Sequence, residues 1–130
     1  MDISEISVFF KEYAKAYLAF DADVLVKFFN FPNLIHDLSG IHLLKNEDDL
    51  RIYEKNFLEN LKQRKTARIE NEVLEYDLSP QLPNAIGCKI AYKLFDIDGQ
   101  LIVDFDYTYS LVKNETWKIL FARLGEVRKY

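Results

Sequence analysis

A tight-turn pair, Asp98-Gly99, separates two long runs of alternating residues and constrains the fold more than any other feature of the sequence. Asp and Gly tolerate the positive φ angles that a two-residue hairpin turn requires. Closing this turn opposes apolar or aromatic residues in four successive pairs on one face: Leu94 with Val103, Tyr92 with Phe105, Ile90 with Tyr107, and Cys88 with Tyr109. On the opposite face Lys93 opposes Asp104 and Lys89 opposes Thr108. A slip of one residue would mix the two faces, so the sequence predicts a half-buried antiparallel hairpin in this register.

Strands are predicted over residues 66–78, 86–97, 101–113 and 116–127. The last hairpin leaves two alternatives, which differ in the face that carries Trp117, Ile119, Phe121 and Arg123. A two-residue turn at Asn114-Glu115 places these four side chains on the outer face, where the apolar ones would need cover from a partner subunit. A three-residue turn places them on the inner face, where a buried Arg123 would demand an anion.

The N-terminal half shows helical spacing instead. One apolar stripe predicts a first helix and consists of Ile6, Phe9, Phe10, Tyr13, Ala14, Tyr17 and Phe20. Asp2 with Glu5, or Ser4, can cap its start. Asp21 then begins a short helix over residues 22–29 that Phe31-Pro32 stops, and residues 33–44 predict two short strands around Ser39-Gly40. A third helix is predicted over 47–65, with Leu50, Tyr53, Phe57, Leu58 and Leu61 on one side.

Composition limits the class of protein. A chain of 130 residues with 49% hydrophobic residues suits one globular domain. The formal net charge of −4 argues against nucleic-acid binding, which needs a basic surface. The single cysteine, Cys88, excludes an internal disulfide and is expected to be a core thiol. The opening "MDISEIS" is unlike a secretory signal, and no apolar run approaches the ~18 residues of a membrane span, so we expect a cytoplasmic protein without a membrane partner.

Three stretches, read with the order of elements, resemble the SnoaL-like superfamily, which includes ketosteroid isomerase, scytalone dehydratase and nuclear transport factor two. They are "FFKEYAKAYLAFDADVLVKFF" (residues 9–29), "HDLSG" (36–40) and "TWKILFARLGEV" (116–127). The resemblance spans about residues 5–127 and implies one α+β domain over 1–130, with N-terminal helices packed into the concave face of a strongly curved antiparallel sheet. It also implies a pocket in this cone-shaped α+β barrel and homodimers joined through the outer face of the sheet. Members range from isomerases, dehydratases and hydrolases to non-catalytic modules, so fold alone selects no function.

The resemblance implies three catalytic candidates. Asp37 resembles the aspartate that moves a proton in ketosteroid isomerase, although Leu38 replaces the usual Pro. We expect partial desolvation to raise its pKa and improve it as a base; the alternative is that Asp37 only caps the Ser-Gly turn. Tyr13 resembles the tyrosine that donates to the developing oxyanion, and its alternative role is in the helix core. Tyr107 faces inward near the place of the isomerase's second acid, whereas Asp104 and Asp106 point outward.

Further residues are expected to line or fill the cavity, namely Tyr17, Tyr92, Phe105 and Tyr109, and His42 is expected at its rim. His36 alternates to the face opposite Asp37, and two histidines without a third ligand make no metal site, so neither metal nor cofactor is expected. No phosphate-binding loop or Ser-His-Asp elbow motif occurs in the sequence. Two hypotheses remain: a small-molecule enzyme or binding protein that uses the cone for acid–base chemistry on an apolar metabolite, or a non-catalytic interaction module whose cone is filled by its own side chains.

Overall fold

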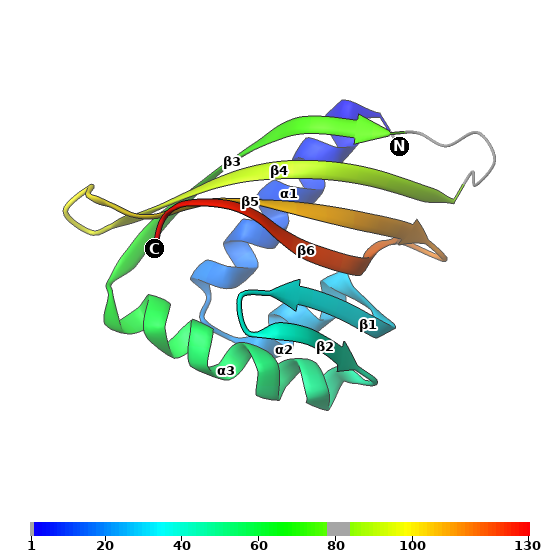
Figure 1. The fold of residues 1–130 in the computed structure, drawn as a ribbon, viewed down its shortest axis with the longest axis horizontal. Helices are drawn as coiled ribbons and strands as arrows, with labels where there is room; N and C mark the ends of the chain where they lie inside the picture. Colours follow the sequence, from blue (N-terminus) through cyan, green and yellow to red (C-terminus); the bar gives the residue numbers. More distant parts are fainter. Residues whose placement is uncertain (1, 78–83) are drawn as a thin grey trace.

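The computed structural model describes residues 2–77 and 84–130 and places helices against one six-stranded sheet (Figure 1). The elements are, in chain order, α1 (Ile3–Leu18), α2 (Ala22–Leu25), the 3-10 turn η1 (Val26–Phe28), β1 (Phe29–Asp37), β2 (Gly40–Leu44), α3 (Glu47–Gln63), β3 (Thr66–Asp77), β4 (Ala85–Asp96), β5 (Leu101–Lys113) and β6 (Trp117–Lys129). The predicted elements are therefore present in the predicted order. The expected end of the third strand segment at Leu78 lies outside the described residues.

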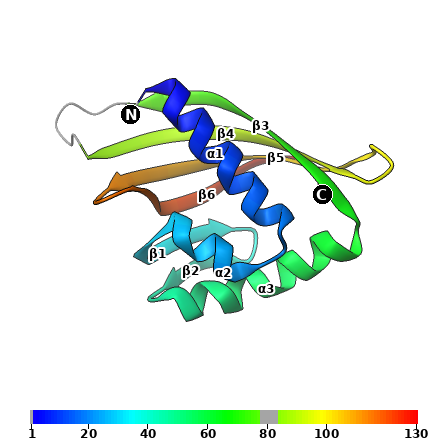
Figure 2. The ribbon, with the colours of Figure 1, turned by 180° about the vertical axis from the view of Figure 1, so that it is seen from behind.

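The sheet is curved, and the helices cover its concave face. Its strand order is β2-β1-β6-β5-β4-β3. Figure 2 shows α1 crossing in front of the long strands, with α2 over the β1–β2 hairpin and α3 running along the open side. The α+β cone expected from the resemblance is confirmed. The sheet is mixed rather than wholly antiparallel, because β1 and β6 run parallel while the other neighbours are antiparallel.

The β4–β5 hairpin has the predicted register. Tyr92 pairs with Phe105, Ile90 with Tyr107 and Cys88 with Tyr109. The two-residue turn expected at Asp98-Gly99 is wrong: residues 97–100 lie between the strands, with Gly99 at a φ of 79°. Ile102 is an extra residue between the pairs of Phe95 with Leu101 and Leu94 with Val103, and this bulge restores the predicted register. Because paired residues share a face, this face packs on Phe10 and Ile6 of α1, which are fully buried. On the outer face, Asp104 and Asp106 point away from the cone as expected, yet the Arg128 guanidinium pairs with both and shields them from water.

Strand β6 combines the two alternatives that the sequence leaves open. A three-residue loop, Asn114–Thr116, pairs Trp117 with Lys113 and Ile119 with Leu111, so Trp117 and Ile119 pack on the core. Leu120 is then an extra residue, because the next pair joins Phe121 to Ser110. This β-bulge shifts the alternation, and Phe121 and Arg123 face outward. The inward Arg123 that would have required an anion is thus absent.

Strand β1 begins earlier than the sequence suggested. The short helix ends at Phe28, one residue before the predicted end, and Phe31-Pro32 lies inside β1 rather than between a helix and a strand. Pro32 falls in a stretch where the β1–β6 register shifts, between the pairs of Phe29 and Leu34. A proline lacks the N–H that a regular ladder needs. The buried Asn33 amide bridges the mismatch by donating to the carbonyl of Ile119 at 2.7 Å.

The three-residue loop before β6 predicts different results for two neighbouring residues. Ile119→Ala removes a fully buried side chain and should lower the free energy of unfolding by about 2–4 kcal/mol. Leu120→Ala alters a side chain that is 37% exposed and should change it by less than about 0.5 kcal/mol. Urea unfolding followed by circular dichroism measures both. Equal losses, or a larger loss at Leu120, would contradict this orientation of β6.

Candidate functional site

Asp37 lies at the end of β1, on the inner face of the sheet, and its carboxylate collects donors from three elements. Oδ1 accepts from the Ser39 amide at 2.8 Å and the Ser39 hydroxyl at 2.6 Å, which forms the turn that the sequence allowed as the alternative role. Oδ2 accepts from the Tyr53 hydroxyl of α3. His42, on β2, contacts Oδ1 at 3.2 Å. Asp37 therefore ties the β1–β2 turn to α3.

His42 and Ser39 do not form a catalytic triad with Asp37. The same ring nitrogen, Nε2, lies 2.7 Å from Ser39 Oγ and 3.2 Å from Asp37 Oδ1. A triad needs the carboxylate and the hydroxyl on different nitrogens of the imidazole. With its proton on Nε2, His42 donates to both oxygens and supports the Asp37 carboxylate.

The pKa of Asp37 is lowered, contrary to our expectation. Partial burial, the largest single influence, raises it, but the hydrogen bonds from Ser39, Tyr53 and His42 together outweigh burial. Hydrogen bonds to the ionised form favour that form. The expectation that desolvation makes Asp37 a stronger base is therefore wrong, because the loop and α3 supply the donors that stabilise its charge.

A second carboxyl, Glu54 of α3, has the opposite character. It is 3% exposed, and burial raises its pKa to about 7, with Asp37 adding to the shift and a hydrogen bond from Tyr17 opposing it. Tyr17 donates to Oε1 at 2.8 Å. The Tyr13 hydroxyl lies 3.1 Å from that of Tyr17. Tyr13, Tyr17 and Glu54 thus form a hydrogen-bonded chain from α1 to α3.

Tyr107 is the third catalytic candidate. It faces the inside of the cone, where its ring stacks on Tyr109 with centroids 5.6 Å apart. Asp37 and Glu54 both act on its pKa, although burial is the main cause of the increase. Within residues 2–77 and 84–130, the Tyr107 hydroxyl has no hydrogen-bond partner in the protein. Its hydroxyl is therefore an uncommitted donor whose pKa responds to both carboxyl groups.

The remaining predicted residues lie deeper in the cone or outside it. The hydroxyls of Tyr92 and Tyr109 are 2.7 Å apart, and Phe105 stacks on Tyr92 at 5.2 Å, so these three fill the region behind Tyr107. Cys88 is a buried free thiol, and burial raises its pKa to about 12. His36 is exposed on the outer face, on the side opposite Asp37 as expected.

Two residues of the candidate site, Tyr53 and Glu54, were not identified from the sequence as functional. Tyr53 was identified only as part of the apolar side of its helix, because nothing local links it to a residue 16 positions earlier. The burial of Glu54, in contrast, could have been predicted from its position in the helix. It lies four residues after Leu50 and four before Leu58, so it interrupts the buried stripe of an amphipathic helix. A carboxyl at such a position must be buried.

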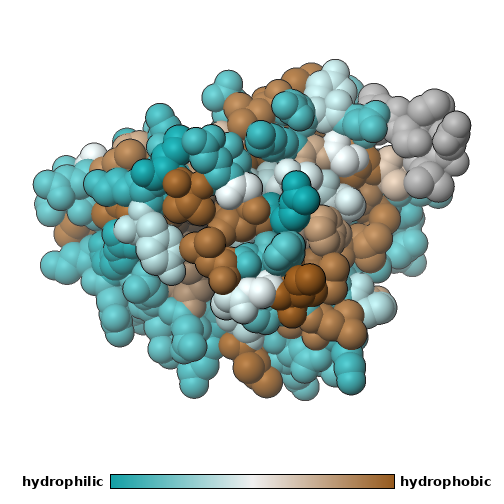
Figure 3. All heavy atoms as spheres, viewed as in Figure 1, coloured by the Kyte–Doolittle hydropathy of each residue, from teal (hydrophilic) through white to brown (hydrophobic). Residues whose placement is uncertain are grey.

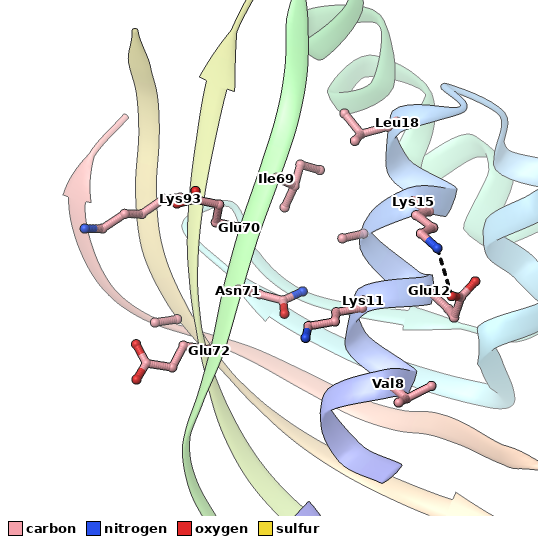
Figure 4. A pocket seen from close by; sticks show the side chains of 12 residues that line it. Val8, Lys11, Glu12, Lys15, Leu18, Ile69, Glu70, Asn71, Glu72 and Lys93 are labelled. Atoms are coloured by element: carbon pink, nitrogen blue, oxygen red, sulfur yellow. Dashed lines mark hydrogen bonds and ion pairs between the residues drawn. The ribbon is translucent and has the colours of Figure 1, made fainter. Parts of the chain in front are cut away.

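Two surface hollows lie away from these residues. Figure 4 shows the larger, an open groove of about 820 Å³ between α1 and β3, with Lys15 and Glu12 paired at its rim. The other, of about 650 Å³, lies between Phe9, Phe28 and Trp117. Asp37 lines neither of them. In the part of the chain described, no group of three or more His, Cys, Asp or Glu side chains is arranged to hold a metal ion.

The raised pKa of Glu54 predicts how stability depends on pH. The folded state binds the Glu54 proton more tightly than the unfolded chain, so its contribution is present below pH 4.5 and is lost as the pH rises to about 7. Relative to Glu54→Gln, the wild-type protein should lose on the order of 3 kcal/mol across this window. Glu59→Gln, an exposed position on the same helix, serves as the control. Denaturant unfolding at several pH values measures the difference, and parallel curves for wild type and Glu54→Gln would refute it.

Comparisons with known proteins agree with this fold. Residues 4–124 match the profile of an NTF2-like protein family, DUF6841, whereas no functionally curated protein matches the chain. No helix in the described residues is both long and apolar enough to cross a membrane.

Two solved structures illustrate the likeness. A domain of unknown function with a cystatin-like fold from Nostoc punctiforme PCC 73102 has a TM-score of 0.74 and 16% identity over 95% of this chain and 75% of its own. An NTF-2 like protein of unknown function from Shewanella oneidensis MR-1 has a TM-score of 0.72 and 17% identity over 97% and 100%. At such identity the structures show the fold alone. The match to the family profile, which spans nearly the whole chain, shows that this protein belongs to the NTF2-like family DUF6841.

Proposed function

We propose that this domain binds a small molecule with an apolar body inside the cone and transforms it by acid–base chemistry, of the isomerase, dehydratase or hydrolase type. The observation that carries the proposal is the pair of carboxyls, Asp37 and Glu54, whose pKa values their surroundings move in opposite directions. Separated pKa values in one site are characteristic of acid–base pairs.

The two carboxyls would have different roles. Asp37 stays ionised, holds Tyr53 and His42 in place, and stabilises positive charge. Glu54, with a pKa of about 7, gains or loses a proton near neutral pH, which suits general acid–base catalysis. Tyr107 supplies an uncommitted hydroxyl that can donate to an oxygen of the ligand.

The surrounding side chains support an apolar ligand. Aromatic rings of Tyr13, Tyr107 and Tyr109 form the walls beside the polar groups, and buried aliphatic residues of β4 and β5 lie behind them. Sites for small molecules combine such apolar walls with a few polar groups that fix the ligand's orientation.

A ligand search tests this proposal. Native mass spectrometry and a thermal-shift screen of apolar carbonyl and hydroxyl compounds should reveal a binder, and Tyr107→Phe should weaken its affinity by about tenfold, the effect of one lost hydrogen bond. Asp37→Asn should reduce turnover. Tyr76→Phe, at an exposed tyrosine of β3, should leave affinity unchanged. Binding and turnover unaffected by both site changes would place the function elsewhere.

The alternative is a non-catalytic module that acts through its surface. Two observations favour it: Tyr92, Phe105 and Tyr109 fill the deep part of the cone, and the outer face of the sheet carries an apolar patch. We define this outer patch by Leu34, Ile41, Leu43, Leu120 and Phe121; Ile41 is 66% exposed and Leu43 58%. Figure 3 shows hydrophobic side chains gathered in the middle of this face. Exposed apolar patches of this kind mark interfaces, and we propose that a second copy of the chain covers it.

The mass in solution tests the proposed homodimer. Sedimentation should give twice the chain mass of 15.4 kDa, and Ile41→Lys with Leu43→Lys should shift the protein to monomer, because two charges cannot be buried without partners. Leu74→Lys changes an exposed leucine of β3, away from the outer patch, and should leave the dimer intact. A wild-type monomer at high protein concentration would exclude this interface.

A further inference from the structure

Glu54 is a buried carboxyl without a cation. Its side chain lies inside the cone, and the one hydrogen bond it receives within the described residues comes from the Tyr17 hydroxyl. None of the ion pairs in this part of the chain involves Glu54. Buried acids are normally paired with a basic side chain or bound to a metal. The second Glu54 oxygen therefore lacks the partner that such a group ordinarily has.

The groups that face Glu54 are acidic or aromatic rather than basic. Five titratable side chains influence the pKa of Glu54 or have their own pKa raised by its charge. They come from four elements: Tyr13 and Tyr17 on α1, Asp37 on β1, Tyr53 on α3, and Tyr107 on β5. Asp37 is paired with His42 alone, at 3.2 Å. The cone thus holds one buried carboxyl, Glu54, a partly exposed one, Asp37, and several aromatic rings, and neither carboxyl is paired with a lysine or arginine of the described residues.

This environment suits a cation and disfavours an anion. A positive charge would be attracted to both carboxyls, and the faces of tyrosine rings stabilise cations further. A carboxylate or phosphate ligand would instead be repelled by Asp37, which is ionised at neutral pH. A neutral ligand would leave Glu54 as it is, buried and without a charged partner.

We propose that the ligand of the cone is a protonated amine on an apolar, ring-sized body, whose ammonium group lies between Glu54 and Asp37 beside Tyr107. The inference rests on the proposed small-molecule site and specifies the chemical class of its ligand. It does not depend on whether the ligand is then transformed.

Binding of such an amine would release a proton. Below the pKa of Glu54, about 7, the carboxyl is mostly protonated. The ammonium group arrives with its charge, Glu54 loses its proton to solvent, and an ion pair forms, so that one proton leaves for each amine bound. Proton release should approach one proton per bound amine near pH 6 and should vanish at pH values well above the pKa of Glu54.

Three probes with the same ring separate charge from shape: 2-naphthylmethylamine, 2-naphthylmethanol and 2-naphthoate. Isothermal titration calorimetry in two buffers of different ionisation enthalpy gives both affinity and proton release. We expect the amine to bind about tenfold or more tightly than the alcohol, the effect of one charged contact with a cation–π contribution, and the carboxylate to bind weakest.

Two variants, with Glu59→Gln as a control, assign the effect to Glu54. Glu54→Gln keeps the shape of the side chain and should abolish both the preference for the amine and the proton release, whereas Glu59→Gln should alter neither. Tyr17→Phe removes the hydrogen bond that lowers the pKa of Glu54, so it should extend proton release to higher pH. Tyr17→Phe keeps the test valid if Glu54→Gln does not fold.

The outcomes distinguish this inference from the proposed function. Equal affinity for amine and alcohol, tighter binding of the carboxylate, or amine binding without proton release would overturn the amine assignment and leave the small-molecule site standing. Failure of all three probes, together with an empty ligand screen, would overturn the site and the amine assignment together.

Discussion

Pairing of Tyr92 with Phe105 and of Cys88 with Tyr109 places aromatic and apolar side chains of two long strands on one side of the sheet, where α1 covers them. The helix contributes Phe10 and Tyr13 to this layer, and their rings contact Tyr109. Burial of so many rings stabilises the domain and also forms the walls around the polar groups. The position of Glu54, Asp37 and Tyr107 relative to one another depends on this layer, because α1 and β5 carry their neighbours.

The parts of the fold that local sequence determines were predictable. The opposed apolar pairs of β4 and β5 indicated the register of their hairpin, although the loop is longer than the expected two-residue turn, and the stripe from Ile6 to Tyr17 defines α1. Two features needed information that no local pattern holds. The parallel pairing of β1 with β6 joins residues such as Ile35 and Ala122 across most of the chain. The bulge at Leu120 depends on how β6 meets β1 and β5 together, so turn length alone could not give it.

The candidate site was predictable to a smaller extent for the same reason. Asp37 was a candidate because of the resemblance, with the Ser-Gly turn as its alternative role, and the prediction that its pKa is raised was wrong. The donors that lower this pKa include Tyr53, which only the tertiary fold brings to β1. Glu54 is the opposite case, since its place among Leu50, Leu58 and Leu61 reveals burial directly. An acidic residue within a predicted apolar stripe therefore merits the same attention as a motif.

The extra residue in β6 has a consequence for how such a chain can change over evolutionary time. Loss of Leu120 would leave Ile119 opposite Leu111 and Phe121 opposite Ser110, so both faces of the strand would keep their side chains. Loss of a residue at a regular position nearby, such as Ala122, would instead turn core residues toward water and surface residues inward. Single-residue deletions in related sequences should therefore be tolerated at this one place in the strand and selected against on either side of it.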